Sequence, residues 1–155
     1  MTDQPSAAPQ QGRALQQSPV SPSLALTILA GGVQQDIARI LAEHGMNPRK
    51  HGALGHIHRE PGISISELAR RSGITAQSMH TLIASLIADD LVQSTIPRPG
   101  APASLAVTDA GTHLLAAIRA ELAVLDERLF GPAAPAEWQA LARAVHAVAE
   151  LRKRT

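Results

Sequence analysis

Residues 63–91 read ISISELARRSGITAQSMHTLIASLIADDL, and this stretch has the pattern of two short helices joined by a tight turn. Ser64 and Glu67 have the spacing of a capping box, in which the hydroxyl accepts a hydrogen bond from a free backbone N–H and the carboxylate reaches back to the cap residue. Ser72-Gly73 supplies a residue for the left-handed conformation that is common at helix ends. The first helix is therefore expected to begin at Ser64 and to end at this pair.

The second helix, which Thr75 is expected to cap, has two chemically distinct faces. Apolar residues recur at intervals of three and four and predict the face that packs into the core: Met79, Leu82, Ile83, Leu86 and Ile87. The opposite face carries small or hydrogen-bonding side chains and no acid: Gln77, Ser78, His80, Thr81, Ala84 and Ser85. Such a face suits the DNA major groove, because it offers donors and acceptors to base edges without repelling phosphate.

A hairpin is expected after the second helix. Residues 91–96 and 103–108 are short strand candidates, and the proline-rich residues 97–102 form the turn between them. Two helices followed by a hairpin predict a winged helix-turn-helix. The fold is therefore expected to be mainly α-helical, with a small β-hairpin wing.

The order and spacing of these motifs resemble the MarR family of bacterial transcriptional regulators. The matching segments are Pro61-Gly62-Ile63, the helix from Ser66 to Arg71, Asp90-Leu91-Val92, and Val107-Thr108-Asp109-Ala110-Gly111 at the end of the wing. The resemblance covers roughly Ile37 to Glu150. It implies a homodimer whose terminal helices intertwine, so that two recognition helices lie about one DNA turn (~34 Å) apart on a pseudo-palindromic operator.

The candidate DNA contacts combine base readers, phosphate contacts and one wing residue. They are Arg70, Arg71, Thr75, Gln77, Ser78, His80, Thr81, Ser85 and Arg98. The wing departs from the family, which usually has an Asp-x-Arg-type basic run whose arginine enters the minor groove. Here the wing has only Arg98, between prolines. Either Arg98 takes the minor-groove role, or it is a solvated turn residue.

The rest of the chain predicts a tail and further helices. Residues 1–22 are rich in Pro, Gln, Ser and Ala and are expected to be disordered. Residues 23–155 are expected to form the MarR-like domain, with a winged-helix core at about 48–110 and dimerisation helices at about 23–45 and 110–153. The apolar stripes of these outer helices are Leu26, Leu29, Val33, Ile37, Ile40 and His44, then Leu115, Ile118, Leu122, Leu125 and Leu129, and finally Trp138, Leu141, Val145 and Val148. One small monomer has too little mass to bury all three stripes, which favours a homodimer.

Four histidines lie close together in sequence: His44, His51, His56 and His58. A zinc site is one interpretation, but no cysteine or paired carboxylate completes a ligand set. Solvated or hydrogen-bonded histidines are the simpler interpretation. The resemblance adds another, because related regulators bind small aromatic or phenolic acids in a crevice between the dimer helices and the winged-helix lobe. His44, His51 and His58 are the candidate ligand-binding residues on that basis.

Composition excludes some classes of function. The formal net charge is +1, so charge alone does not indicate a nucleic-acid partner, and the absence of cysteine excludes a thiol switch. No hydrophobic run approaches the ~20 residues of a membrane span, and no signal-peptide pattern begins the chain, so a cytoplasmic protein without a membrane partner is expected. No catalytic constellation or cofactor motif is present and no metal-ligand set is complete, so an enzyme is not expected.

These observations together predict a function. The chain is expected to be a sequence-specific, double-stranded DNA-binding transcriptional regulator that acts as a homodimer, most simply a repressor released by a small aromatic or phenolic effector. Two alternatives remain: a winged helix used for protein–protein contact, and a metal-responsive regulator that uses the histidine cluster.

Overall fold

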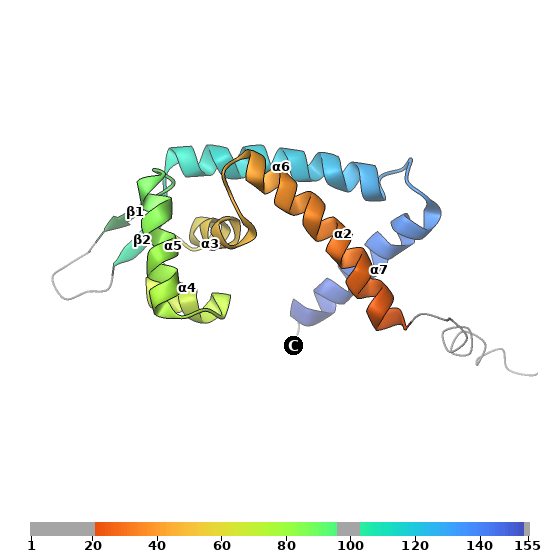
Figure 1. The fold of residues 1–155 in the computed structure, drawn as a ribbon, viewed down its shortest axis with the longest axis horizontal. Helices are drawn as coiled ribbons and strands as arrows, with labels where there is room; N and C mark the ends of the chain where they lie inside the picture. Colours follow the sequence, from red (N-terminus) through yellow and green to blue (C-terminus); the bar gives the residue numbers. More distant parts are fainter. Residues whose placement is uncertain (1–20, 96–102, 154–155) are drawn as a thin grey trace, which may run out of the picture. The chain divides into compact units, whose positions relative to one another are not determined.

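The computed structural model describes residues 21–95 and 103–153. The chain divides into two compact units, residues 1–36 and 37–155, which are described separately. In chain order the elements are α2 (Pro22–Glu43), α3 (Pro48–Arg59), α4 (Ile65–Ser72), α5 (Ala76–Ala88), β1 (Val92–Thr95), β2 (Ser104–Val107), α6 (Asp109–Phe130) and α7 (Ala136–Lys153). The expectation of a mainly helical fold with a small hairpin wing is confirmed (Figure 1).

The helices of the second unit begin where the capping residues predict. The hydroxyls of Ser64, Thr75 and Thr108 accept hydrogen bonds from backbone N–H groups three residues later and so start α4, α5 and α6. Gly73 ends α4 in the left-handed conformation, with φ of 65°. The turn between α4 and α5 is thus fixed by local chemistry at both ends.

The structure contains only one of the two hydrogen bonds of the expected capping box. The Ser64 hydroxyl does accept from the Glu67 N–H at 3.2 Å. The Glu67 carboxylate does not complete the box, because both of its oxygens bind arginines on the same helix. Two nearby guanidinium groups are stronger partners for a carboxylate than one backbone N–H.

The wing is a two-stranded antiparallel hairpin, in which Val92 pairs with Val107 and Thr95 with Ser104. The backbone before α4 extends this pairing, because the Gly62 N–H donates to the Leu105 carbonyl at 2.8 Å. Gly62 has φ of +96°, a conformation that residues with a side chain rarely adopt. This bond joins the base of the wing to the start of the helix-turn-helix.

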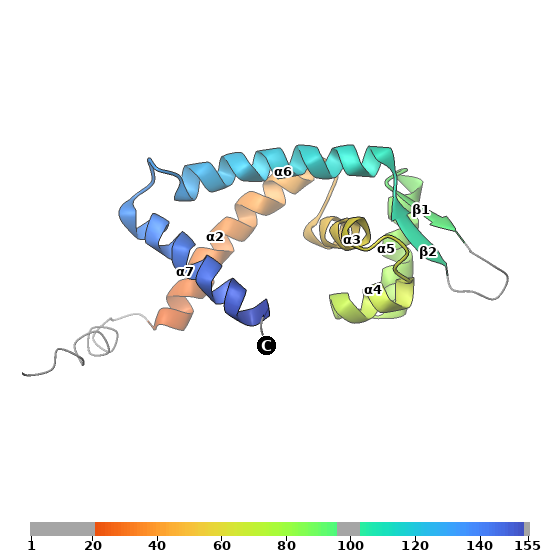
Figure 2. The same ribbon diagram turned by 180° about the vertical axis from the view of Figure 1, so that it is seen from behind.

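The core of the winged-helix lobe lies where α3, α5, β2 and α6 meet. Its fully buried side chains are aliphatic or methionine: Leu41, Leu54, Ile57, Leu68, Met79, Ile83, Leu86, Leu105 and Ile118. Figure 2 shows α3 end-on between α4 and α6, and α3 makes contacts with both. Close packing of such side chains fixes the helices with respect to one another.

Two details of the predicted apolar stripes differ from the structure. Ile87 is 42% exposed, because it lies about 100° around α5 from the fully buried Leu86 and so at the edge of the packed face. In α2 the buried residue is Leu41, which was not in the predicted stripe. The seam of α6 is confirmed, since Leu115, Ile118 and Leu125 are buried.

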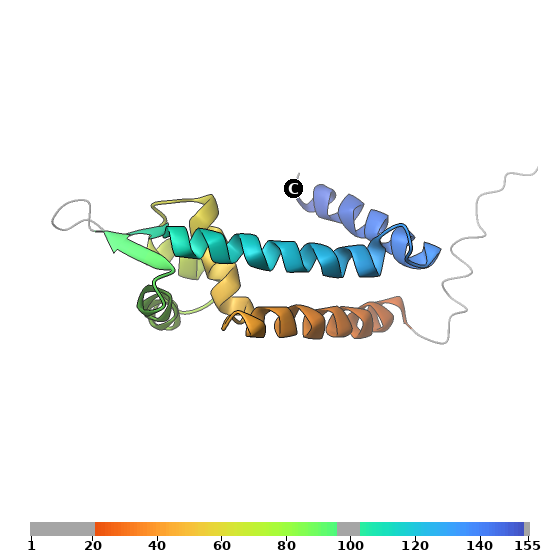
Figure 3. The ribbon, with the colours of Figure 1, turned by 90° about the horizontal axis from the view of Figure 1, so that it is seen from above.

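At its far end α6 leads into α7, as the view from above shows (Figure 3). Gly131 follows the last residue of α6, and its N–H donates to the Glu127 carbonyl. The rings of Phe130 and Trp138, 5.8 Å apart between centroids, pack across the turn. Beyond them the apolar face of α7 is exposed at Val145, Val148 and Leu151.

The helix α2 corrects the expectation that no hydrophobic run approaches the length of a membrane span. Within the ranges 21–95 and 103–153, it is the one helix that is long and apolar enough to cross a membrane, judged by length and composition alone. Its mean hydropathy of 1.2 is reached because alanine, glycine and threonine extend the run of leucine and isoleucine. Leu24, Leu26, Ile28 and Leu29 in its first half are exposed.

Candidate nucleic-acid interface

The exposed face of α5 is polar and free of acidic side chains. Gln77, Ser78, His80, Thr81 and Ala84 are exposed, and Ser85 is half-buried. Met79, Ile83 and Leu86 on the opposite face are at most 1% exposed. The two faces expected from the sequence are therefore confirmed as a buried face and a solvent-facing one.

The hydroxyl groups on this face are partly occupied by bonds within the helix. Thr81 donates to the Gln77 carbonyl at 3.2 Å and Ser85 to the Leu82 carbonyl at 2.8 Å. Thr75 donates to the Ser78 hydroxyl at 2.8 Å while it caps the helix, so its proton is also used. Ser78 keeps its proton and is the hydroxyl best placed to donate to another molecule.

Gln77 and His80 have the most available polar groups on this face. Within the described part of the chain, neither side chain forms a hydrogen bond, and both are exposed. The Gln77 amide carries two N–H donors and a carbonyl acceptor, which can bind adenine bidentately in the major groove. Their role at base edges stays a prediction.

The two α4 arginines are held by acidic side chains. Arg70 donates from Nε and Nη2 to the Glu67 carboxylate, at 2.8 and 2.6 Å. Arg71 donates from Nε to Glu67 at 2.6 Å, and from Nη1 and Nη2 to the two carboxylate oxygens of Glu60, the latter at 3.2 Å. The hydrogen bonds from Arg70 and then Arg71 lower the pKa of Glu67 to about 2. Bonding to Glu60 and then Glu67 raises the pKa of Arg71, so Glu67 and Arg71 both stay charged near neutral pH.

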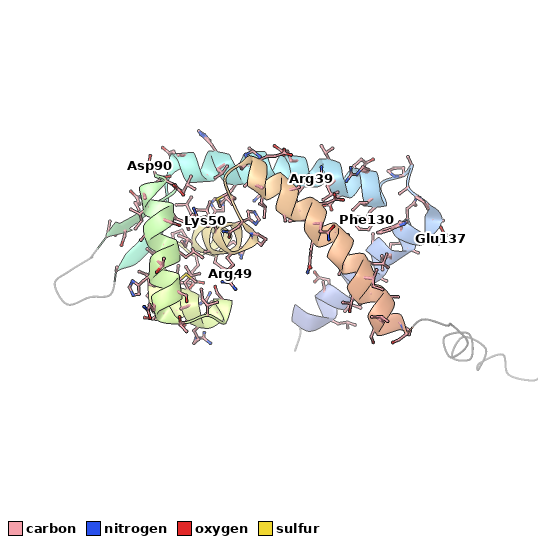
Figure 4. All side chains as sticks on the ribbon, in the orientation of Figure 1. Arg39, Arg49, Lys50, Asp90, Phe130 and Glu137 are labelled. Atoms are coloured by element: carbon pink, nitrogen blue, oxygen red, sulfur yellow. The ribbon has the colours of Figure 1, made fainter. Side chains whose placement is uncertain are left out.

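The C-terminal end of α5 is fixed by two contacts from other elements. Lys50 on α3 forms an ion pair of 2.9 Å with Asp89, the C-cap of α5, where α3 faces α5 (Figure 4). The next residue, Asp90, has φ of 57°, and its carbonyl accepts from the Thr108 hydroxyl at 2.6 Å. These contacts hold α5 against α3 and the start of α6.

Arg98, the expected wing contact, lies outside the described residues, as do the turn 97–102 around it and the N-terminal residues 1–20. The structure describes the base of the wing, at Val92–Thr95 and Ser104–Val107. The minor-groove role of Arg98 stays a prediction.

The three candidate ligand histidines lie in different environments. The Nε2 atom of His44 is 2.8 Å from a carboxylate oxygen of Glu121 on α6. His51 is half-buried, and burial, followed by the nearby charge of Arg59, lowers its pKa, so its neutral form is favoured. His58 is exposed. In the part of the chain that the structure describes, no three His, Asp or Glu side chains are grouped as metal ligands would be.

Two hollows lie near these elements. One, of about 370 Å³, lies beside α5 and is lined by Pro48, Arg49, Gly52, Ala53, His56, Ser72, Ile74, Met79 and Leu82. The other, of about 260 Å³, lies between the end of α2 and α6 and is lined by Arg39, Ile40, Glu43, Glu121, Val124, Leu125 and Arg128. His44, His51 and His58 line neither of them, whereas His56 lines the first. A lining that combines apolar side chains with Arg49 and His56 suits a small acidic molecule.

Sequence reasoning missed three charged residues that shape this surface: Lys50, Glu60 and Asp89. Their partners are 39 positions away for Lys50 and 11 positions away for Glu60, so no local spacing indicates them. A signal did exist for Glu67, because acids and arginines three and four positions apart on a helix are neighbours.

Comparisons with known proteins agree with this geometry. The MarR family model matches residues 44–100. The HTH-type transcriptional regulator PetP of Rhodobacter capsulatus is 37% identical over 67 residues, a match that covers 43% of this chain and only 40% of PetP.

Solved structures extend the likeness along the chain. MepR, a transcription regulator of the Staphylococcus aureus multidrug efflux pump MepA, has a TM-score of 0.72 at 16% identity, over 85% of this chain and 99% of MepR. The Mycobacterium tuberculosis MarR family protein Rv2887 has a TM-score of 0.60 at 26% identity, over 83% of this chain and 95% of Rv2887. The winged helix, its order of elements and these matches lead to one conclusion: residues 44–100 of this chain are similar to the MarR family, and the fold is like that of the MarR family protein Rv2887.

Proposed function

We propose that this protein is a sequence-specific DNA-binding transcriptional regulator that acts as a homodimer. The observation that carries the proposal is the exposed face of α5, which is polar, free of acids and fixed at both ends. In a helix-turn-helix, the second helix enters the major groove and the first crosses the phosphate backbone. By that geometry α5 reads bases and α4 faces phosphate.

Gln77, Ser78, His80 and Thr81 are the base-edge candidates, because they are exposed on that face. Thr75 and Ser85 contribute at its margins. Arg70 and Arg71 on α4 and Arg98 in the wing are the phosphate and minor-groove candidates. Phosphate contacts set register and affinity, whereas base contacts set sequence preference.

Related proteins support a DNA partner. Rv2887 has also been solved in complex with DNA, with a TM-score of 0.66 to this chain at 19% identity. PetP is named as a transcriptional regulator, but the match spans two fifths of its length, so its activity supports the proposal and does not establish it. Neither PetP nor the solved relatives are described as enzymes, and we propose none for this chain.

Exposed apolar side chains support the homodimer. Val145, Val148 and Leu151 recur at three-residue intervals on α7, and α2 also exposes several leucine and isoleucine side chains. Contiguous exposed apolar surface on a helix marks an interface or a membrane contact. We favour a dimer in the cytoplasm, because Asp36 and Arg39 interrupt the apolar run of α2.

We further propose that a small aromatic or phenolic acid relieves repression. The hollow lined by Arg49 and His56 beside α5 is of the size that small ligands occupy. A ligand that binds one arrangement of the two lobes better shifts the dimer toward it, so both recognition helices no longer fit successive grooves.

The test is fluorescence anisotropy of the purified protein with duplex DNA from upstream of its own gene, with random duplex as control, across a salt series. A specific regulator is expected to bind the upstream duplex at least ~1000-fold more tightly, with affinity that falls as salt rises. Weak binding to both duplexes, and to any sequence selected from a random pool, would favour a protein-binding winged helix. Binding that appears only with added zinc would favour the metal-responsive alternative.

A further inference from the structure

Arg70 and Arg71 and their acidic partners form a network without net charge. Glu60 ends α3 and Glu67 lies on α4, so the four side chains contribute two positive and two negative charges. All four are at least about one third exposed, and Arg70 is 72% exposed. The network therefore lies on the surface of the helix that, under the proposed function, crosses the phosphate backbone.

The two arginines differ in what they leave available. A guanidinium has two edges that can each bind an anion bidentately: Nε with Nη2, and Nη1 with Nη2. Arg71 has both edges occupied, the first through Nε by Glu67 and the second by Glu60. Arg70 uses only the edge formed by Nε and Nη2. Arg70 can thus bind a phosphate through Nη1 while it keeps its hydrogen bonds to Glu67, whereas Arg71 must first release a carboxylate.

This network is a poor source of folding stability. Exposed ion pairs contribute little, because water screens them and the side chains lose rotational freedom. A carboxylate that occupies an arginine instead withholds that arginine from DNA phosphate. The effect of Glu60 and Glu67 on DNA binding should therefore exceed their effect on folding.

We propose that Glu60, together with Glu67, competes with DNA phosphate for Arg71 and so holds the DNA affinity of this protein below what its arginines would otherwise give. The inference rests on the proposed function. It makes two acids, which do not contact DNA, determinants of affinity. Binding requires Arg71 to exchange a carboxylate for a phosphate, and the exchange has a cost that operator and random duplexes share.

The experiment compares E60Q with wild type on the upstream duplex and on random duplex, again across a salt series. Glutamine keeps the shape of the side chain but removes the charge. E60Q is expected to bind both duplexes about 3- to 10-fold more tightly, and to steepen the slope of log affinity against log salt by up to about 0.9, the value for one more phosphate contact. E67Q should act in the same direction.

The control is D126N, which changes the net charge by the same amount at an exposed position on α6, outside the helix-turn-helix. It is expected to change affinity less than about 2-fold, since exposed charges beyond a Debye length are screened. The gain from E60Q should also vanish in an R71Q background, because there is then no arginine to release. Circular dichroism melts check that each variant folds.

Each outcome has a distinct meaning. Unchanged or weaker binding by E60Q, a gain equal to that of D126N, or a gain that persists with R71Q would overturn the competition proposal. A wild-type protein without preference for any duplex, combined with a tighter E60Q on random DNA, would overturn sequence-specific regulation and leave the competition standing. Absence of DNA binding by every variant at low salt would overturn both.

Discussion

Gly111→Ala should destabilise the winged-helix lobe, although alanine is normally preferred in helices. Gly111 is buried in the first turn of α6, where the wing returns to the helix. A Cβ there would lie 2.3 Å from the Leu91 carbonyl oxygen and 2.7 Å from Val107 Cγ1. An ordinary carbon–oxygen contact is about 3.3 Å or longer, so the overlap with the carbonyl is roughly 1 Å.

The clash cannot be relieved by a side-chain rotation. The Leu91 carbonyl accepts from the Thr108 N–H at 3.1 Å, so moving it weakens a bond that joins the two ends of the hairpin. Overpacking of this kind costs about 1–3 kcal/mol, and a weakened hydrogen bond adds about 1 kcal/mol. Alanine returns about 1 kcal/mol of helix propensity. The net loss is about 1–3 kcal/mol, or a fall in Tm of roughly 3–10 °C for a chain of this size.

Urea or thermal unfolding followed by circular dichroism measures this loss, at equal protein concentrations because a dimer's stability depends on concentration. The matched control is Gly52→Ala in α3, where a Cβ would meet nothing within 4 Å. That variant is expected to gain about 0.5–1 kcal/mol. If Gly111→Ala unfolded at the same midpoint as wild type, or gained stability as Gly52→Ala does, the close approach of Leu91 would not hold in solution.

Three further predictions concern DNA, pH and assembly. Gln77→Ala should lower affinity at particular base pairs by about 1–3 kcal/mol, whereas Arg98→Ala should weaken binding to every duplex. Titrations of the two variants against single-base operator variants distinguish these effects. Equal effects of both substitutions on all operators would contradict the assigned roles. The folded pKa of Glu67 is about 2, against an ordinary 4.5, so the small stabilisation from its bonds is fully present above pH 4.5 and is lost as the pH falls toward 2. The small difference in stability between wild type and Glu67→Gln should close over that window, and a constant difference would contradict this reasoning. Val148→Glu should shift the protein toward monomer, as measured by light scattering, because it adds a charge to the exposed apolar face of α7. An unchanged molecular mass would show that this face is not part of a dimer interface.

The features that could be predicted from sequence are those fixed within a few residues. Thr75, Thr108 and Gly73 start or end helices through bonds to neighbours three or four positions away, so their spacing was informative. The apolar periods of α5 and α6 predicted their buried faces for the same reason. Ile87 was assigned wrongly because periodicity gives a direction around the helix and not the edge of the packed face.

The features that could not be predicted depend on contacts between distant segments. The pairing of Arg71 with Glu60 requires α3 to end beside α4, and that of Lys50 with Asp89 requires α3 to begin beside the end of α5. Neither follows from composition, which shows only that the acids and bases nearly balance. The candidate DNA contacts were therefore named from one helix face, without the acids that hold two of them.

The anchoring of α5 limits how an effector can act. Thr75 caps its start, Met79, Ile83 and Leu86 are buried along its length, and Lys50 holds its end through Asp89. A helix held in this way cannot turn within its lobe without breaking a packed core, since such cores are not continuously deformable. Under the proposed function, relief of DNA binding is then expected to come from movement of the whole lobe relative to the proposed dimer partner. An effector that weakens DNA binding while the amide protons of α5 keep their protection from hydrogen exchange would agree with this reasoning. Loss of that protection would indicate instead that the effector melts the helix.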